Sequence, residues 1–352
     1  MMKESTVSPT EYGVFLPIGN GGWLVSTTAP HPEATYAYNK QVALDAEAAG
    51  LDFIMSMAKW KGFGGSTDHW GETLESMTMM AALAECTSTV KIWATMHANL
   101  HHPLVAAKMY TTLQQVSGGR AGMNIVNGSY PDEFEQMGVW AEMSKEDRYR
   151  MTAEWTEAVT RLWAEDEVTM DSEFFTLDHA ESRPHPSPRP TIINAGASDL
   201  GMEFQAAHAD GAFLGADSFE EMAAKSRFVH TRAAELGREC KTYAMLTVVQ
   251  GSSDAEADER VSAYGEGLDR EALLNMSLAW GLPEEWARSW VAGATGEKAF
   301  QVPYVAGSAT TLATEIRRLV AAAELDGLML IFPDYLVDLP VFGRTVLPQL
   351  RA

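Results

Sequence analysis

The feature that most constrains the fold of this chain is a regular alternation of short apolar runs with longer stretches of helical pattern. Most of the runs are continuously apolar, which is typical of strands that are buried on both faces of a parallel sheet. The eight strand-like runs lie at residues 12–18, 51–57, 90–96, 121–126, 191–195, 211–215, 243–249 and 327–332. Apolar residues at helical spacing, such as Met109 and Leu113, mark the intervals between them.

Eight strands with helices between them predict a (β/α)8 TIM barrel with inserted loops. The expected helices lie at residues 38–49, 75–86, 103–116, 145–164, 200–209, 219–236, 254–267, 270–278 and 309–323, and an inserted hairpin is expected at 166–190. A doubly wound sheet is the alternative, but it usually has fewer strands, and no G-x-G-x-x-G motif follows the first run. Because the sequence has no linker or low-complexity segment, we expect residues 1–352 to form a single domain.

The composition disfavours several classes of function. A formal net charge of −22 argues against nucleic acid and anionic membrane surfaces as partners. No apolar stretch reaches the length of a membrane span and the first residues have no apolar signal core, so we expect a cytoplasmic protein. Cys86 and Cys240 lie far apart without metal-binding spacing, and we interpret both as reduced thiols.

Polar residues gather where the predicted strands end, and long connections follow several of these ends. The connections are residues 19–37, 59–65 and 127–144, together with the tryptophan-rich segment 279–304, which we expect to act as a lid. The polar and glycine residues at strand ends are Thr95, His97, Asn124, Asn127, Gly128, Asn194, Gly196, Ser198, Asp217 and Ser218. Helix capping is the simplest role for the last three of these. Together, on one rim of a barrel, the group predicts a ligand site, and Gly196-Ala197-Ser198 at a helix start suits a phosphate.

Hydrolytic and metal-dependent chemistries find less support. His97 and His101 have the spacing of metal ligands only if both lie on one helix, whereas here Pro103 begins the helix after them and His102. No carboxylate is near in sequence to complete a metal set, so a metal-dependent hydrolase is a remote alternative and we expect no metal. There is no G-x-S-x-G motif of serine hydrolases.

Ser-Gly-Gly-Arg at residues 117–120, followed by Asn124-x-Val126-x-Gly128 and a downstream glutamate, resembles the signature of the bacterial luciferase-like flavin monooxygenase family. Further segments share the resemblance, at residues 13–23, 57–65, 74–76, 133–138 and 195–202. As a set they extend it over most of the chain. The resemblance implies a TIM-like barrel, in agreement with the strand count made without it.

The resemblance also implies a two-component oxygenase. A separate NAD(P)H-dependent flavin reductase supplies reduced FMN (FMNH2), and the protein uses it with O2 to oxygenate a small, pyrimidine-like N-heterocycle or amide, with ring or C–N cleavage as one outcome. A flavin-dependent sulfone or sulfonate monooxygenase and a deazaflavin-dependent dehydrogenase of the same fold are the alternatives. The implied assembly is a homo-oligomer, either a dimer or a tetramer.

The site residues that the resemblance implies fall into three groups. The flavin contacts are Ala58, Lys59, Asn124, Glu133, Arg148, Tyr149 and Ser198. Thr95 and Asn124 lie beside the reactive edge of the ring, where O2 is held, and are the expected catalytic residues. The expected substrate pocket consists of Met57, Asn127, Tyr130, Trp23 and Phe63. The chain departs from the pattern at residues 127–129, which are Asn-Gly-Ser instead of Thr-Gly-Trp, and at His97, which replaces a small residue.

Overall fold

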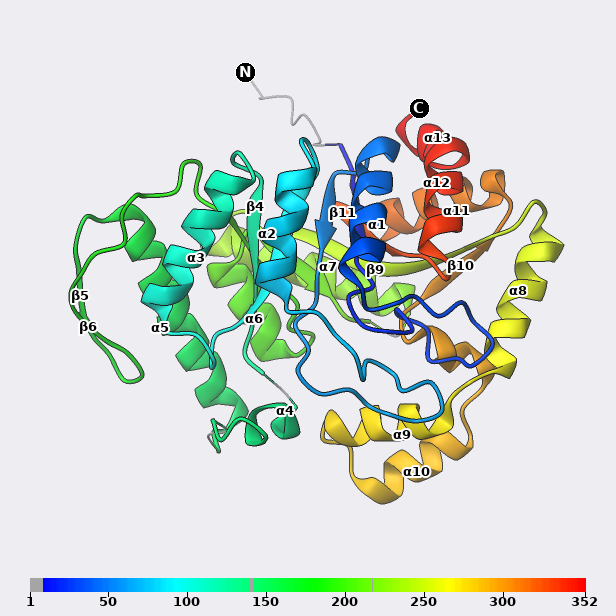
Figure 1. The fold of residues 1–352 in the computed structure, drawn as a ribbon, viewed down its shortest axis with the longest axis horizontal. Coiled ribbons are helices and arrows are strands. Elements are labelled where there is room, and N and C mark those ends of the chain that lie inside the picture. The colour runs from blue at the N-terminus through cyan, green and yellow to red at the C-terminus, as the bar shows by residue number, and fades with distance from the viewer. Residues whose placement is uncertain (1–8, 129, 140–141, 217) are drawn as a thin grey trace.

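Eight parallel strands close into a barrel in the computed structural model, which describes residues 9–352 except 129, 140, 141 and 217 (Figure 1). The barrel strands are β1 (Glu11–Phe15), β2 (Phe53–Met55), β3 (Lys91–His97), β4 (Ala121–Val126), β7 (Thr191–Asn194), β8 (Gly211–Leu214), β9 (Lys241–Gln250) and β11 (Gly327–Ile331). Each strand pairs with the next in this order, and β11 pairs with β1 to complete the ring. This closure confirms the predicted TIM barrel, because a doubly wound sheet would remain open at both edges.

Helices surround the barrel, and their bounds lie close to the predicted ones. They are α1 (Tyr36–Ala49), α2 (Ser76–Cys86), α3 (Pro103–Val116), α5 (Lys145–Ala164), α6 (Asp199–His208), α7 (Phe219–Glu235), α8 (Asp254–Glu266), α9 (Arg270–Ala279) and α11 (Ala309–Ala323). Ser198 and Ser218 accept hydrogen bonds from backbone N–H groups of α6 and α7, which confirms their predicted capping roles. Asp217 and Ser129 lie outside the described residues.

Two helices near the end of the chain, α12 (Tyr335–Thr345) and α13 (Leu347–Arg351), were not predicted. Pro340 lies inside α12, and a proline usually ends a helical pattern. The burial of Tyr335, Leu339 and Phe342 against the barrel stabilises α12 despite it. None of the helices within the described residues has both the length and the apolar character that crossing a bilayer requires.

Several inserted segments lie between the strands and helices of the barrel. The hairpin of β5 (Val168–Asp171) and β6 (Thr176–Ala180) confirms the expectation for residues 166–190. The segment 279–304 was expected to be a loop and is not: it contains α10 (Glu284–Ala292) and the 3-10 helix η1 (Gly296–Phe300) and leads into β10 (Tyr304–Gly307). Strand β9 makes this addition possible, because its first residues pair with β8 while Thr247–Gln250 pair with β10. A short helix, α4 (Pro131–Glu135), also follows β4.

Aromatic side chains fill the amino-terminal half of the barrel interior. Trp93 of β3 stacks on Phe53 with 4.0 Å between ring centroids, and both rings contact Phe213 and Tyr243 from the other side of the barrel. Gly122 makes room for them, because a Cβ atom there would lie 2.3 Å from the Trp93 ring. The interior is therefore packed at this end, and a ligand site belongs at the carboxyl ends of the strands.

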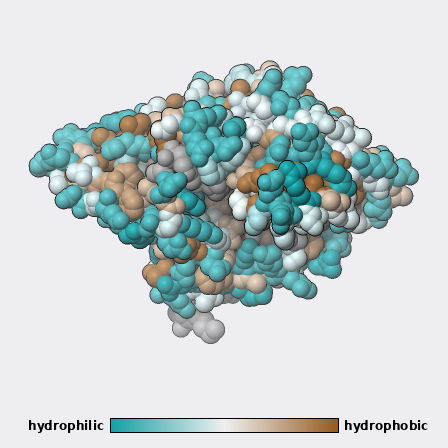
Figure 2. Space-filling view, turned by 90° about the horizontal axis from the view of Figure 1, so that it is seen from below, coloured by the Kyte–Doolittle hydropathy of each residue, from teal (hydrophilic) through white to brown (hydrophobic). Residues whose placement is uncertain are grey.

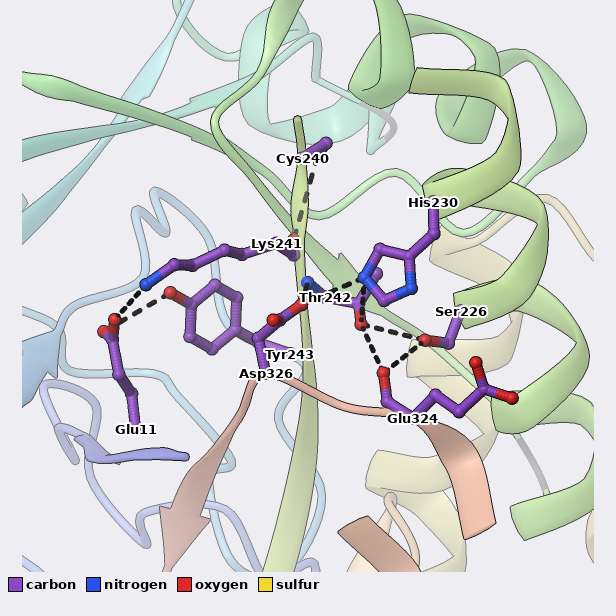
Figure 3. A network of polar contacts seen from close by, with 9 residues as sticks. All are labelled: Glu11, Ser226, His230, Cys240, Lys241, Thr242, Tyr243, Glu324 and Asp326. Atoms are coloured by element: carbon purple, nitrogen blue, oxygen red, sulfur yellow. Dashed lines mark hydrogen bonds and ion pairs between the residues drawn. The ribbon is translucent and has the colours of Figure 1, made fainter. Parts of the chain in front are cut away.

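Charged groups cover the amino-terminal end of the barrel (Figure 3). Glu11 of β1 forms ion pairs with Lys91 at 2.7 Å and with Lys241 at 2.5 Å. Asp326 accepts hydrogen bonds from the backbone N–H of Thr242 at 2.7 Å and is 3.0 Å from His230 Nε2. Burial acts to raise the pKa of both carboxyl groups, but the hydrogen bonds and positive charges around them hold each pKa below its ordinary value.

Candidate functional site

Thr95 and Asn124 form a hydrogen-bonded pair in the carboxyl-terminal half of the barrel. They face each other across β3 and β4, and Asn124 Nδ2 donates to Thr95 Oγ1 at 2.9 Å. The Thr95 hydroxyl in turn donates to the carbonyl oxygen of Ser56. Both side chains are buried, and none of the residues that the structure describes pairs with Asn124 Oδ1. An unpaired buried acceptor is costly, so a ligand N–H group at this position would relieve a real penalty.

The Thr95–Asn124 pair has a rigid support behind it. Ser56 and Ser76 are linked through their hydroxyl groups at 2.6 Å, and the backbone N–H of Thr95 donates to Ser76 Oγ at 2.9 Å. Ser76 is the first residue of α2, so that helix and strands β2 and β3 together hold the pair. The orientation of the Asn124 amide is therefore set before any ligand binds.

Lys59 and Glu133 form a buried ion pair at the same end of the barrel. Lys59 follows β2, Glu133 lies in α4, and Lys59 Nζ is 2.9 Å from Glu133 Oε1. The same carboxylate oxygen accepts a hydrogen bond from the backbone N–H of Trp60 at 2.8 Å. Burial lowers the pKa of Lys59, and the negative charge of Glu133 opposes that shift. The two expected flavin contacts thus tie the loop after β2 to α4.

An aromatic wall stands beside this ion pair. The Phe63 ring lies 5.6 Å from the rings of Tyr130 and Trp70 and 6.4 Å from that of Trp280, between centroids. Trp23 continues the wall, 5.0 Å from Trp70. Lys59 Nζ lies 4.1 Å from the centroid of Phe63 and 4.3 Å from that of Tyr130, which places a cation over both rings.

The wall borders a cavity of about 480 Å³ that Phe63, Tyr130, Asn275 and Ala279 help to line. Figure 2 looks onto this end of the molecule, where apolar residues appear between hydrophilic ones. A second cavity of about 380 Å³ lies beside it, and Trp280 and Gln301 are among its lining residues. Substrate-sized space therefore lies next to the residues that the sequence predicted for substrate contact.

The start of α6 forms a separate polar cradle. Gly196 and Gly201 lie so close to Tyr149 that a Cβ atom on either would be within 2.7 Å of its hydroxyl oxygen. Ser198 caps the helix between them, and Arg148 precedes Tyr149 on α5. The Arg148 guanidinium donates to the carbonyl oxygen of Met143 at 2.9 Å. A helix start and a hydroxyl group suit a phosphate.

The structure brings most of the predicted site residues to one end of the barrel. Met57 joins the wall, because a Cβ atom on Gly19 would lie 3.0 Å from its Cε atom and 2.7 Å from Trp70. Ala58 and Asn127 are half-buried at the ends of β2 and β4. Within the described part of the chain, no group of three or more histidine, cysteine or carboxylate side chains is arranged to hold a metal.

His97 ends β3 and His101 and His102 follow it, and the three histidines each have a different partner. His97 Nδ1 is 3.3 Å from Trp60 Nε1, His101 Nδ1 is 3.1 Å from the carbonyl oxygen of His97, and His102 Nδ1 accepts from the backbone N–H of Leu104. His102 therefore acts as the cap of α3.

Sequence reasoning missed His69, Trp70, Trp280 and Gln301. His69 is fully buried, its Nε2 atom is 3.0 Å from Gln301 Nε2, and burial lowers its pKa to about 3. Trp70 and Gln301 both have a φ of 56°, in the left-handed region that non-glycine residues rarely adopt. The many tryptophans in these loops were the only available signal for the two indole rings, and nothing in the sequence distinguished His69.

A model of the luciferase-like monooxygenase family matches residues 10–325. Pyrimidine monooxygenase RutA from Methylorubrum extorquens strain AM1 is 33% identical over 348 residues, which cover 97% of this chain and 96% of the relative. The protein of the same name from Caulobacter segnis is 33% identical over 356 residues, covering 97% and 99%. The solved structure of long-chain alkane monooxygenase LadA has the same fold, with a TM-score of 0.85, 19% identity and coverage of 98% and 91%.

Proposed function

The chain belongs to the luciferase-like monooxygenase family, and on this premise we propose that it is an FMNH2-dependent monooxygenase that oxygenates a small N-heterocycle or amide of the pyrimidine type. A separate NAD(P)H-dependent reductase supplies the reduced flavin. The observation that carries the proposal is the unpaired, buried Oδ1 atom of Asn124 beside the Thr95 hydroxyl. The N–H groups of a flavin ring could donate the hydrogen bond that this oxygen atom does not receive from the protein.

Reduced FMN, when bound, supplies the electrons that activate O2. The chain's own residues bind and orient it: Asn124 accepts a hydrogen bond from the ring, and Ser198, Tyr149 and Arg148 hold the phosphate at the start of α6. The serine network behind Thr95 keeps its hydroxyl in one orientation. Lys59 and Glu133 hold the loop after β2 against α4.

The substrate side of the site consists of Met57, Asn127 and the aromatic wall. Flat rings such as Phe63 and Tyr130 suit a planar heterocycle, and the Asn127 amide offers both a donor and an acceptor. The segment 279–304 covers this side and, with Trp280, excludes water from the reaction. The relatives at 33% identity, which are named for a pyrimidine substrate, support the pyrimidine class.

A sulfonate substrate has less support. An anionic sulfonate would need a free cation in the pocket, whereas the buried Lys59 is already neutralised by Glu133 at 2.9 Å. A neutral heterocycle needs no such charge.

Turnover under labelled oxygen tests the proposal. The purified protein is supplied with FMN, a generic flavin reductase and NADH under ¹⁸O2, with uracil and related pyrimidines as substrates. We expect one labelled oxygen atom in the product. Absence of label in every pyrimidine product contradicts the substrate class, and failure to bind reduced FMN contradicts the cofactor. Reduced FMN that binds without consuming O2 points instead to a dehydrogenase of this fold.

A further inference from the structure

His97 lies at the carboxyl end of β3, one step beyond the Thr95–Asn124 pair. Side chains two positions apart on a strand point to the same side, so Trp93, Thr95 and His97 all face the barrel interior. Two residues of strand advance the chain by roughly 6.6 Å. The imidazole therefore lies between the proposed oxygen-reacting region and the mouth of the barrel, where a substrate enters.

The contacts of His97 specify which of its nitrogens carries the proton. The indole N–H of Trp60 can only donate, and it lies 3.3 Å from His97 Nδ1. Nδ1 is therefore the acceptor and Nε2 carries the hydrogen. Burial lowers the pKa of His97 to about 3, so the ring is neutral near pH 7 and keeps one donor and one acceptor.

The ring is also held in place by residues of the site. The edge of the imidazole packs against Phe134 of α4, with 5.2 Å between ring centroids. Trp60 is itself held at both ends, because its backbone N–H donates to Glu133 and its carbonyl oxygen accepts from Gln136 Nε2 at 2.9 Å. The elements that orient His97 are thus those that carry the proposed flavin contacts.

The Nε2–H group has no such partner. Among the residues that the structure describes, none accepts a hydrogen bond from it, although the side chain is only 4% exposed. Nε2 is not one of the fully buried polar atoms that lack a partner, so this N–H group keeps contact with open space and is available to an acceptor atom of a bound molecule.

We propose that His97 Nε2–H donates a hydrogen bond to a carbonyl oxygen of the substrate, and that Trp60 is the positioning residue that holds the imidazole in this tautomer. The inference rests on the proposed function and adds a recognition element to it: the substrate presents a carbonyl or amide acceptor toward β3.

The test uses uracil as the substrate and compares wild type with His97→Phe, His97→Gln and Trp60→Phe. Phenylalanine keeps a flat ring without a donor, whereas glutamine restores an N–H group. We expect His97→Phe to lower kcat/KM roughly 10- to 100-fold, mainly through KM, and His97→Gln to recover part of the loss. Trp60→Phe is expected to have a smaller effect of the same kind. His179→Asn, on the hairpin and far along the chain, is the matched histidine control, because asparagine tolerates the positive φ of 50° there.

Imidazole ¹⁵N NMR gives a readout that a merely structural role would not move. We expect a protonated Nε2 in the wild type, a shift of its resonance when uracil binds, and a mixture of tautomers in Trp60→Phe. An unchanged kcat/KM in His97→Phe, or an Nε2 resonance that uracil leaves in place, would overturn the inference. Binding and oxidation of reduced FMN are measured separately in each variant. Their failure in the wild type would overturn the proposed function instead.

Discussion

At the scale of single residues, Asn124 combines a structural cost with a proposed function. Its Nδ2 group donates a hydrogen bond to Thr95, while its buried Oδ1 atom has no partner within the described part of the chain. A buried polar group without a partner needs an explanation, and a ligand that completes it is one such explanation. The Tyr149 hydroxyl group is also closely packed. It lies against two glycines, at which there is no room for a side chain.

Replacing Asn124 should separate stability from activity. In Asn124→Leu one hydrogen bond is lost, but the unpaired buried oxygen is lost as well, so we expect the free energy of unfolding to change by less than about 1.5 kcal/mol. Reduced-flavin affinity and coupled turnover should fall by roughly tenfold or more. Urea denaturation and flavin titration measure the two effects. A variant that keeps full coupled turnover would refute the proposed contact.

The glycine at the start of α6 permits a second test. In Gly196→Ala the new methyl group would lie 2.6 Å from the Tyr149 hydroxyl oxygen, so we expect a loss of about 1–3 kcal/mol in stability and weaker flavin binding. Adding Tyr149→Phe removes the clashing oxygen and should restore part of the stability. Thermal unfolding of both single variants and the double variant measures this coupling, and strictly additive effects would contradict it.

At the scale of elements, the loop after β2, helix α4 and the segment from α9 to η1 meet over the mouth of the barrel. Phe63 contacts Tyr130 on one side and Trp280 on the other, so it links the three. The sequence placed the strands and most helices well, because burial imposes a period of two or 3.6 on local segments. It missed α10, β10 and α12, whose stability depends on partners distant in the chain.

Trp280 allows the proposed lid to be tested. We expect Trp280→Ala to increase the hydrogen peroxide released per O2 consumed, because the cavity it lines becomes more open to water. The matched control is Trp286→Ala, because Trp286 is about as exposed as Trp280, 51% against 56%, but stacks on Trp290 instead of the wall. Both should unfold within about 1 kcal/mol of the wild type. Equal peroxide release from the two variants would contradict the lid role.

At the scale of the whole molecule, the buried titratable groups make stability depend on pH. His69 and His97 each have a pKa lowered to about 3, so the folded protein does not bind the protons that the unfolded chain takes up below about pH 6.5. Glu11 and Asp326 have lowered pKa values as well, so their stabilising effect is complete above their ordinary pKa and is lost as the pH falls through the folded-state pKa.

Stability should therefore fall in two stages on acidification. From about pH 6.5 downward the two histidines each contribute a slope of up to about 1.4 kcal/mol per pH unit, and below about pH 4.5 the carboxylates add to it. Urea unfolding between pH 4 and pH 8 measures the slope. His97→Phe should remove the His97 contribution, and an unchanged slope in that variant would show that His97 is protonated in the folded state.

Local patterns determined the barrel, the strand that carries Asn124 and the caps of α6 and α7, because continuous apolar runs and capping residues act over a few neighbouring positions. Closure of the barrel decided the rest. It brought Gln301 to His69, 232 positions away, and Trp280 to Phe63, and it left the Oδ1 atom of Asn124 without a partner among the residues described. Such pairings depend on how distant strands meet and have no local period, so only the tertiary structure reveals them.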